Sequence, residues 1–365
     1  MRVAFYNVTA SFLSGGLETY CWEAGRALAR RGHDVTIVAG DRGNARHDEV
    51  RLIQFPFRSE KEWPDLGVRF RRLAERLSFA RRSMRHLVGG DYDAVIVNKP
   101  FDFPILWWAR RVGLKAGTLF RSGGTDFFPL DRRFSGSIDF WVSASRYNAR
   151  QVEARYGRRV EVIHNGVDTD VFTPRARDPE LRAGYARPEQ LIVVSVGRLV
   201  GWKGLQVILE AIATLPFLQY VIVGSGPEEA ALKAHALRLG VSDRVAFAGR
   251  VSHGDLPRLL AQCDIFVQPS TGEEAFGISV VEAMACGLPV LASDNGGLPE
   301  IIVDGSTGFL LPPGNVVAWR AKLADLARDK AHMTQLGVSG RERAVSHFTW
   351  SANAKRLESL LLGRR

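Results

Sequence analysis

Short apolar runs, many of them followed by a stretch with helical periodicity, recur along the chain. The first run is RVAFYNV at residues 2–8; GGLETYCWEAGRALARRGH follows it, and DVTIVAG at residues 34–40 comes next. The same pattern returns in DAVIVN, FWVSAS, VEVIHNG, LIVVSVG, YVIVGSG, RVAFAG, DIFVQPS and LPVLASD. β-Branched and aromatic residues are frequent in these runs, which is typical of strands. Alternation of strands with helices predicts an α/β fold built from doubly wound parallel sheets.

The chain has 365 residues, which is more than one hydrophobic core usually holds, so we expect two domains. The segment DTDVFTPRARDPELRAGYARPEQ is polar and contains proline, which is typical of a linker. The predicted parts are a first domain at residues 1–170, a linker at 171–190 and a second domain at 191–345. Ligands of such sheets bind beyond the carboxyl ends of the strands, so the loops that follow strands are the candidate sites.

Three scattered cysteines, Cys21, Cys263 and Cys286, contain no CxxC pair and predict neither a structural zinc nor a disulfide framework. The start MRVAFYNVTASFLSGG lacks the basic stretch and apolar run of a signal peptide. No apolar run approaches the roughly 18 residues that indicate a membrane span. The expected location is therefore the cytoplasm.

The formal net charge is +10, and most of it lies in the first half of the chain. Up to Asp170 there are 28 lysines and arginines against 20 acidic residues, a net +8; the remainder has 21 against 19, a net +2. An acidic partner of the first domain is expected, either a phosphorylated ligand, a nucleic acid or an anionic membrane surface. Aromatic residues do not interleave with the basic runs, which argues against a nucleic acid.

Residues 66–87 predict a basic amphipathic helix. Its apolar residues recur at steps of three and four, which places them on one helix face. They are Leu66, Phe70, Leu73, Leu77, Ala80, Met84 and Leu87, and the arginines on the rest of the surface include Arg69, Arg72, Arg76, Arg82 and Arg85. The helix either packs on its own sheet or touches anionic lipid. Both can hold, because arginine stems can pack while their charged heads face phosphates.

The stretch GEEAFGISVVEAMACGLPV contains three acidic residues, Glu273, Glu274 and Glu282, and the last two have seven residues between them. If one helix ran through both, they would lie roughly 12 Å apart along its axis. A pair of carboxylates that acts on one glycosidic bond is about 5–9.5 Å apart, so these two are better placed to hold two ends of an elongated ligand. Gly277, Ile278 and Ser279 lie where the helix should begin, and free backbone N–H groups there bind anions. This order of acid, anion site and acid fits a sugar hydroxyl, a diphosphate and a ribose.

Cations for such a diphosphate are available in SVGRLVGWKGLQ, where Arg198 and Lys203 follow a strand. Arginine offers a planar pair of donors to phosphate oxygens, and lysine offers a point charge. In the first domain, Gly15 and Gly16 follow the first strand and let the backbone approach a ligand closely. Each feature alone is usually structural; their joint position in strand-to-helix loops favours a binding site.

Taken together, these motifs make the sequence resemble the retaining nucleotide-sugar glycosyltransferases of family 4, which have the two-domain GT-B fold. The matching segments are Gly15–Gly16, HNGVDTDVF, GRLVGWKG, VGSGPEE, FAGRVSHGDL and EAFGISVVEAMACGLPVLASDNGGLPEII, the last of which carries the family's E-x7-E element. The resemblance spans nearly the whole chain and is most specific in its second half. It implies two Rossmann-like domains that face each other across a cleft, with a terminal helix at residues 346–365 that packs back on the first domain.

The resemblance also implies roles for the motif residues. Arg198 and Lys203 would neutralise the donor diphosphate, Glu274 would bind the donor sugar, and Glu282 would hold the ribose hydroxyls. The family's route with retention of configuration needs no protein nucleophile.

Backbone groups complete the donor site that the resemblance implies. Gly277 and Ile278 would offer backbone to the phosphate or the sugar, Ser279 beside them is a further donor-binding candidate, and Val251 would lie near the base. Gly16 would close on the diphosphate from the first domain, and Gly15 beside it is a further donor-binding candidate.

One segment departs from the family. Many members carry a histidine after the strand that here begins GTLFRSGGTDFF, and this chain has the segment Arg121–Asp126 instead. Arg121 and Asp126 are candidates for contacts with the acceptor. The alternative is structural: Asp126 would cap the loop and Arg121 would form an ion pair.

The function implied is a retaining glycosyltransferase that moves a sugar from a UDP-, GDP- or ADP-linked donor to a lipid-linked or cell-envelope glycan. Such an enzyme would work as a peripheral protein at the cytoplasmic face of the inner membrane, without a metal or other cofactor. A non-catalytic sugar-nucleotide-binding protein and a GT-B sugar epimerase or phosphorylase remain as alternatives. A dinucleotide site at GSGPEE is disfavoured, because the third glycine of GxGxxG is missing.

Overall fold

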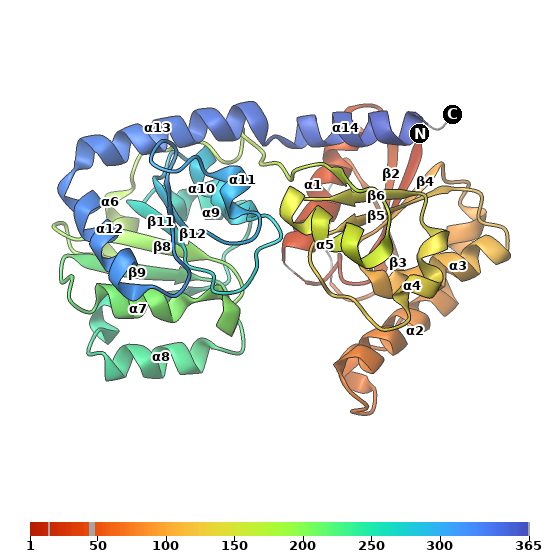
Figure 1. Ribbon diagram of the computed structural model, residues 1–365, viewed down its shortest axis with the longest axis horizontal. Coiled ribbons are helices and arrows are strands. Elements are labelled where there is room, and N and C mark those ends of the chain that lie inside the picture. The colour runs from red at the N-terminus through yellow and green to blue at the C-terminus, as the bar shows by residue number, and fades with distance from the viewer. Residues whose placement is uncertain (14, 44–47, 364–365) are drawn as a thin grey trace. The chain divides into compact units, whose positions relative to one another are not determined.

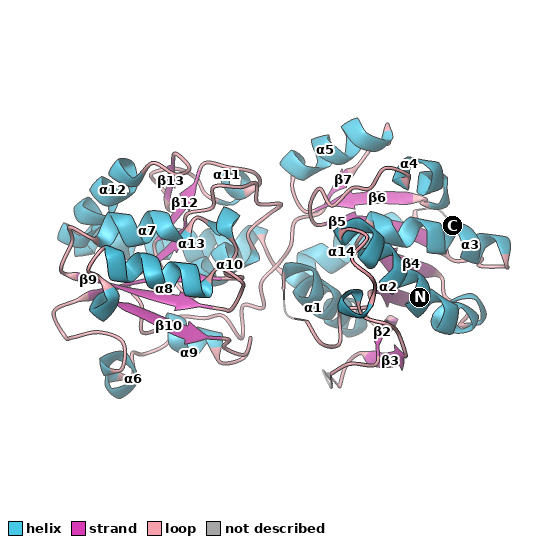
Figure 2. Cartoon of the chain, turned by 90° about the horizontal axis from the view of Figure 1, so that it is seen from below, coloured by secondary structure: helices cyan, strands magenta, loops and turns pink. Residues whose placement is uncertain are grey.

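The computed structural model describes residues 1–13, 15–43 and 48–363. The chain divides into two compact units, which are described separately. The first unit contains residues 1–165 together with the residues from Trp350 onward, and the second contains Gly166–Thr349. Each unit is a parallel sheet with helices on both faces (Figure 1, Figure 2). The predicted α/β fold with two doubly wound parallel sheets is therefore confirmed.

In the described part of the first unit, seven parallel strands form the sheet, in the order β3-β2-β1-β4-β5-β6-β7. Their bounds are β1 (Arg2–Tyr6), β2 (Asp34–Gly40), β3 (Arg51–Phe55), β4 (Ala94–Val97), β5 (Gly117–Ser122), β6 (Phe140–Ser143) and β7 (Glu161–Val162). The α-helices are α1 (Gly16–Arg30), α2 (Val68–Gly89), α3 (Phe103–Arg111), α4 (Asp131–Phe134), α5 (Arg146–Tyr156) and α14 (Trp350–Leu362). Three 3₁₀ turns join them, η1 (Glu60–Glu62), η2 (Pro100–Asp102) and η3 (Ser135–Ser137).

Six parallel strands form the sheet of the second unit, in the order β10-β9-β8-β11-β12-β13. Their bounds are β8 (Leu191–Val196), β9 (Leu218–Val223), β10 (Val245–Gly249), β11 (Ile265–Gln268), β12 (Val290–Ser293) and β13 (Phe309–Leu311). The α-helices are α6 (Pro179–Ala183), α7 (Leu205–Ile212), α8 (Glu229–Arg238), α9 (Leu256–Leu260), α10 (Ile278–Ala285), α11 (Leu298–Ile301), α12 (Val316–Arg328) and α13 (Lys330–His347). The 3₁₀ turns are η4 (Gly201–Lys203) and η5 (Ser242–Arg244).

The central strands are apolar on both faces because helices cover both. All four residues of β4 and of β11 are buried. Continuous apolar runs of this kind are typical of parallel sheets, whose crossover helices exclude water from either side. The sequence pattern therefore follows directly from the layer structure.

Each sheet reverses its strand order at one point, between β1 and β4 in the first unit and between β8 and β11 in the second. At such a point the loops that leave the two neighbouring strands run to opposite faces of the sheet, which opens a crevice beyond the carboxyl ends. The loops after β8 and β11 are those that carry the predicted Lys203 and Glu274.

Two edge strands, β3 and β13, were not among the predicted strands. Both are short, with five and three residues, and most of their residues are only partly buried. An edge strand has one hydrogen-bonded neighbour and less cover, so its sequence needs no long apolar run.

The amphipathic helix predicted at residues 66–87 is α2, and its two halves differ. In the second half Phe79, Ala80 and Leu87 are buried against the sheet, as the packing interpretation predicts. In the first half Phe70 and Leu77 are 42% and 43% exposed. This first half projects from the rest of its own unit (Figure 1). Among the described residues, no helix combines the length and hydrophobicity that crossing a membrane requires.

The last described helix, α14, belongs to the first unit and packs on α1. The rings of Tyr20 and Trp350 lie 6.1 Å apart, and Arg31 forms an ion pair with Glu358. The first unit is thus assembled from two stretches of chain that are far apart in the sequence.

Candidate functional site

The loops after β8 and β11 are packed tightly against each other in the second unit. Gly204 has a φ of 66°, and a Cβ there would lie 2.0 Å from the carbonyl oxygen of Pro269. Only glycine fits such a position, because it tolerates the left-handed conformation and has no side chain to clash. The close approach brings Lys203, which precedes Gly204, beside Glu274.

Glu274 is buried and accepts three hydrogen bonds on one oxygen. Lys203 Nζ, Gln268 Nε2 and Ser270 Oγ donate to Glu274 Oε1 at 2.5, 2.6 and 2.8 Å. The side chains of Lys203 and Glu274 are only 15% and 9% exposed. Among the described residues, none donates a hydrogen bond to Oε2 of Glu274. The carboxylate is fixed in orientation while its second oxygen is left for a ligand hydroxyl.

Glu282 lies in α10, one helix turn into the element, and Glu274 lies in the loop before it. The two acids are therefore not on one helix, and the separation of roughly 12 Å along a shared helix axis does not apply to them. Glu282 Oε1 is 2.7 Å from His253 Nε2, and the ring of His253 lies 4.9 Å from that of Phe172. Separate partners thus hold the two carboxylates, which agrees with two contacts on one long ligand.

The start of α10 has the properties of an anion site. Its N-cap, Gly277, has a φ of 118° and provides no side-chain cap. The backbone N–H groups of Ile278 and Ser279 donate no hydrogen bond within the described chain. The Ser279 hydroxyl instead contacts Gln268 Oε1 at 3.4 Å. Free N–H groups at a helix N-terminus attract phosphate oxygens.

The remaining predicted donor residues occupy less constrained positions. Arg198 is exposed and lines one small hollow together with Lys203 and Gln268. Val251 lies half-buried in the loop after β10. Gly15 and Gly16 lie at the start of α1 in the first unit, with Gly15 as its N-cap.

Three polar residues of the site were missed by the sequence interpretation, namely Gln268, Ser270 and His253. Each lies inside a motif that the sequence analysis quoted. A polar side chain at the end of an otherwise apolar strand was the available signal for Gln268, because burial of an amide demands a partner.

The two candidate acceptor residues of the first unit differ in character. Arg121 is 1% exposed; its guanidinium donates to Asn165 and lies 4.1 Å over the ring of Tyr20. Burial lowers the pKa of Arg121. Its Nε has no partner, and it forms no ion pair within the described chain, so the structural ion pair expected for it is absent there.

Asp126 is the residue of this segment that forms ion pairs. Its carboxylate lies 2.7 Å from Arg72 Nη1 and 3.3 Å from Lys99 Nζ, and its side chain is 45% exposed. Burial opposes the charged form of Asp126, but Lys99 and Arg72 outweigh it and lower its pKa. Burial lowers the pKa of Lys99. A partly open cluster of both signs suits a ligand that carries hydroxyls and a phosphate.

No group of three metal-ligating side chains is gathered in residues 1–13, 15–43 and 48–363. The site described above offers cations and N–H groups to an anion instead.

The role of Gln268 can be tested by Gln268→Leu, which keeps the approximate volume and removes one donor to Glu274. Because the orientation of Glu274 then depends on Ser270 and Lys203 alone, we expect kcat/KM to fall roughly tenfold. Steady-state kinetics measure the change. The matched control is Gln219→Leu, on a buried glutamine of β9 that does not contact Glu274. Equal kinetics for both variants would contradict a positioning role for Gln268.

Comparisons with known proteins agree over nearly all of the chain. The family described as Glycosyl transferases group 1 matches residues 177–343, and Glycosyltransferase Family 4 matches residues 14–171. The chain is 30% identical to a GDP-mannose-dependent alpha-(1-6)-phosphatidylinositol monomannoside mannosyltransferase of Mycolicibacterium smegmatis, over 96% of each chain. It is 37% identical to a D-inositol 3-phosphate glycosyltransferase of Mycobacterium marinum, over 53% of this chain and 42% of that protein.

Solved structures share the fold at lower identity. Sucrose-phosphate synthase from Thermosynechococcus elongatus superposes with a TM-score of 0.85 at 22% identity, covering 100% of this chain and 99% of the other. Anabaena HepE in complex with UDP and glucose gives 0.83 at 22% identity, covering 99% of each. WaaG, a glycosyltransferase involved in lipopolysaccharide biosynthesis, gives 0.77 at 19% identity, covering 99% of this chain and 100% of the other.

Proposed function

This chain belongs to the glycosyl transferases of group 1, and we propose that it transfers mannose, with retention of configuration, from GDP-mannose to a lipid-linked acceptor. Membership of the family makes it a sugar-nucleotide-dependent glycosyltransferase. The choice of GDP-mannose is supported by the GDP-mannose-dependent relative, which is similar over nearly its full length.

The site of the second unit supports a nucleotide-sugar donor through one observation above all. Glu274 presents one free carboxylate oxygen, held in place by Lys203, next to a helix start with free N–H groups. We assign Glu274 to the donor sugar and Glu282 to the ribose. Arg198 and Lys203 are assigned to the diphosphate. Gly277, Ile278 and Ser279 are assigned to the diphosphate or the sugar through backbone N–H groups. Val251 is assigned to the base, and Gly15 and Gly16 of the first unit are assigned to the diphosphate.

The chemistry that follows is departure of GDP from the anomeric carbon. Negative charge grows on the diphosphate as the bond to the sugar breaks. Fixed cations and N–H groups that already point at this position stabilise the charge without reorganisation, which is the largest contribution in many enzymes. Lys203 and Arg198 supply the positive charge that a divalent metal provides elsewhere.

Calorimetric titration with GDP, UDP and ADP tests the donor assignment. We expect micromolar binding of GDP, weaker binding of UDP and ADP, and loss of GDP binding in Lys203→Ala. Tighter binding of UDP than of GDP would overturn GDP-mannose while leaving the site in place. Failure of all three nucleotides to bind at millimolar concentration would overturn the site itself. Release of mannose or its transfer from bound GDP-mannose would then exclude a non-catalytic binding protein.

The acceptor is assigned to the first unit. The relatives named above include one that acts on a phosphatidylinositol mannoside and one named for inositol 3-phosphate. The partly open cluster of Asp126, Lys99 and Arg72 offers a carboxylate for sugar hydroxyls and two cations for a phosphate. Arg121 is too deeply buried for a direct contact, so we assign it to support of this region rather than to the acceptor.

A membrane surface is the proposed partner of the first half of α2 and of the segment before it. Leu66, Val68 and Phe70 are 69%, 50% and 42% exposed, and basic residues accompany them. Arg58, Lys61 and Arg69 are exposed, whereas Arg71 is partly buried and pairs with Asp65 at 3.5 Å. Apolar side chains beside cations are the combination that binds at the surface of an anionic bilayer. A peripheral position would keep the enzyme close to a lipid-linked acceptor.

Leu66→Glu tests this membrane contact. A charge in place of a leucine that enters the bilayer interface should weaken binding to phosphatidylglycerol-containing vesicles by roughly tenfold or more. Vesicle co-sedimentation at low salt measures it. Leu237→Glu is the matched control, since Leu237 is 72% exposed on α8 of the second unit. Equal loss in both variants, or no binding of the unmodified protein, would remove the membrane from the proposal.

A further inference from the structure

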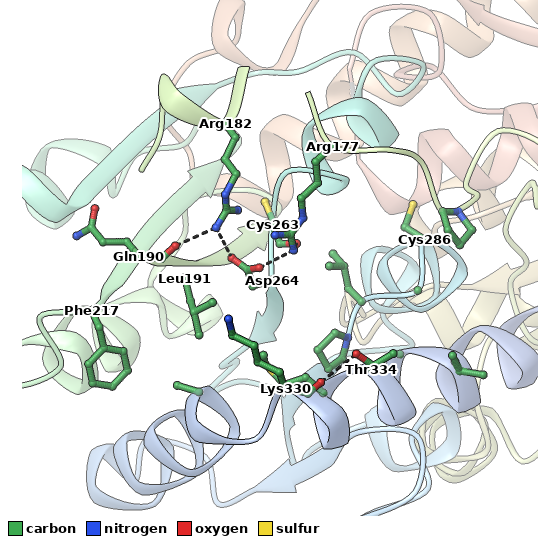
Figure 3. Close-up of a pocket in the computed structure, with 18 of the residues that line it drawn as sticks. Arg177, Arg182, Gln190, Leu191, Phe217, Cys263, Asp264, Cys286, Lys330 and Thr334 are labelled. Carbon is green, nitrogen blue, oxygen red and sulfur yellow. Dashed lines mark hydrogen bonds and ion pairs between the residues drawn. The ribbon is translucent and has the colours of Figure 1, made fainter. Parts of the chain in front are cut away.

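A second cavity lies in the second unit, at the amino ends of the strands. The candidate donor site lies at the carboxyl ends of the same strands. The volume of the cavity is about 800 Å³. Leu191, Asp264 and Pro289 lie at the amino ends of β8, β11 and β12, and all three line it. The segment around α6 and the junction of α12 with α13 form the other walls (Figure 3). Lys203 and Glu274 follow the carboxyl ends of the same sheet, so the two sites are separate.

Cations dominate the polar lining of this cavity. Asp264, whose side chain is 5% exposed, is bound by Arg177 at 2.5 Å and by Arg182 at 2.9 Å. Arg182 is further engaged with the carbonyl groups of Gln262 and Gln190. Arg177 is 51% exposed, and beyond Asp264 it has one long contact, with a carbonyl at 3.5 Å. The lining thus holds two carboxylates, Asp264 and Glu189, against five cations, which are Arg177, Arg182, Arg328, Lys330 and Arg341. Asp264 is already paired with two of these cations, and Arg177 remains half exposed.

Lys330 adds a further positive charge from the facing wall. Figure 3 shows its amine directed into the cavity, toward Asp264 and the two arginines. Lys330 is the first residue of α13 and is exposed, and no described residue pairs with its amine. A cation in the first turn of a helix is disfavoured by the helix dipole. Lys330 also lies two residues beyond the end of α12, where the dipole of that helix favours a cation.

The rest of the lining is apolar. It includes Phe217, Leu191, Leu288, Pro289, Met333 and Val338. The volume lies in the range of small-molecule pockets, which combine apolar walls with a few polar groups that orient the ligand. Burial raises the pKa of Cys286, which also lines the cavity, to about 12, so its thiol remains neutral and adds no charge.

We infer that this cavity binds an organic phosphate, with the phosphate between Lys330 and Arg177 and the organic group against the apolar wall. A doubly charged phosphate suits the solvent-exposed donors of Arg177 and the point charge of Lys330. An apolar or ring-bearing group suits Leu191, Phe217 and Met333. The inference does not depend on which sugar the enzyme transfers.

Two elements of the second unit, α10 and β11, connect the cavity with the donor site. α10, which carries Glu282, ends at Ala285, and the next residues, Cys286 and Gly287, line the cavity. β11 starts beside Asp264 and ends at Gln268, which holds Glu274. A ligand that fixes these two ends is expected to change nucleotide affinity, and by linkage a bound nucleotide changes the affinity for that ligand to the same extent.

The test is calorimetric titration of the Lys203→Ala protein with phenyl phosphate; the variant removes a phosphate contact of the donor site. We expect binding that weakens roughly tenfold or more in Lys203→Ala/Lys330→Glu, because a charged contact is replaced by a repulsive one. Lys203→Ala/Lys355→Glu is the matched control: it has the same net charge, and Lys355 is exposed on α14 of the first unit. Glutamate at the first position of α13 favours the helix dipole, so folding is preserved, and circular dichroism checks it.

Two further titrants identify the source of the ligand. Dihexanoyl phosphatidic acid, a soluble lipid phosphate, should bind more tightly than phenyl phosphate if the ligand is a lipid, and less tightly if it is a soluble metabolite; either result supports the inference. If inorganic phosphate bound as tightly as phenyl phosphate and the lipid, the organic group would add nothing to binding, and that part of the inference would be wrong. No binding of phenyl phosphate or the lipid at millimolar concentration would overturn the site, as would equal affinities of the Lys330→Glu and Lys355→Glu proteins. Arg177→Gln, on the wall opposite Lys330, is also expected to weaken the binding of phenyl phosphate.

Discussion

Replacement of Lys203 by alanine is expected to lower kcat by roughly 10²–10³-fold, the scale of losing one preorganised group that stabilises charge in the transition state. Two effects combine. The developing charge on the leaving diphosphate loses a cation, and the Glu274 carboxylate loses the donor at 2.5 Å that helps to orient it. Arg198→Ala removes a cation but leaves the donor to Glu274 in place. We expect kcat of this variant to fall by a factor in the same range, roughly 10²–10³. Steady-state turnover of the donor measures both variants.

Lys233→Ala is the control for this prediction. Lys233 lies on α8 of the same unit, is 54% exposed and pairs with Glu229 at 2.6 Å. It carries the same charge at a position outside the site, so its removal should leave kcat unchanged. Normal turnover in Lys203→Ala would contradict the role of Lys203 in catalysis, and with it the proposed position of the diphosphate.

The largest loss of stability is expected for Asp102→Ala. Asp102 Oδ1 lies 2.5 Å from Arg76 Nη1, and the two side chains are 1% and 4% exposed. Without Asp102 the Arg76 guanidinium stays buried with no carboxylate bonded to it, so the free energy of unfolding of the first unit should fall by about 3–5 kcal/mol. Urea denaturation followed by fluorescence measures the change.

Two further variants separate the cost of breaking this pair from its net contribution. Replacing both partners, as Arg76→Met with Asp102→Leu, removes the two buried charges together and should recover most of the loss. Asp34→Ala breaks an ion pair with Arg2 that is 3.7 Å long and about half exposed, and should cost less than about 1 kcal/mol. An equal loss for Asp102→Ala and Asp34→Ala would contradict the role of burial.

Much of the fold was predictable because the physical cause of each element is local. Central strands such as β4 and β11 need continuous apolar runs, since helices cover both faces, and those runs are visible in the sequence. The edge strands β3 and β13 escaped prediction because one free edge and partial burial remove that requirement. The division of α2 into a packed half and an exposed half also depends on where the sheet ends, which periodicity does not report.

The candidate site was predictable to the extent that motif spacing specifies it. Lys203 and Glu274 are 71 residues apart in the sequence. The structure brings them together because β8 and β11 are neighbours at the point where the strand order reverses. Gln268 and His253, which hold the two glutamates, could not be found in this way, because their roles arise from packing of side chains between loops.

The two-part construction of the first unit has a consequence for synthesis on the ribosome. Arg31, which follows the last residue of α1, pairs with Glu358 on α14, and the two lie 327 positions apart in the sequence. The nascent chain emerges from its amino end, and domains generally fold as units during translation. The face of α1 around Tyr20 therefore stays uncovered while the entire second unit is made, and a chaperone that shields this face during elongation would act before Trp350 arrives to close it.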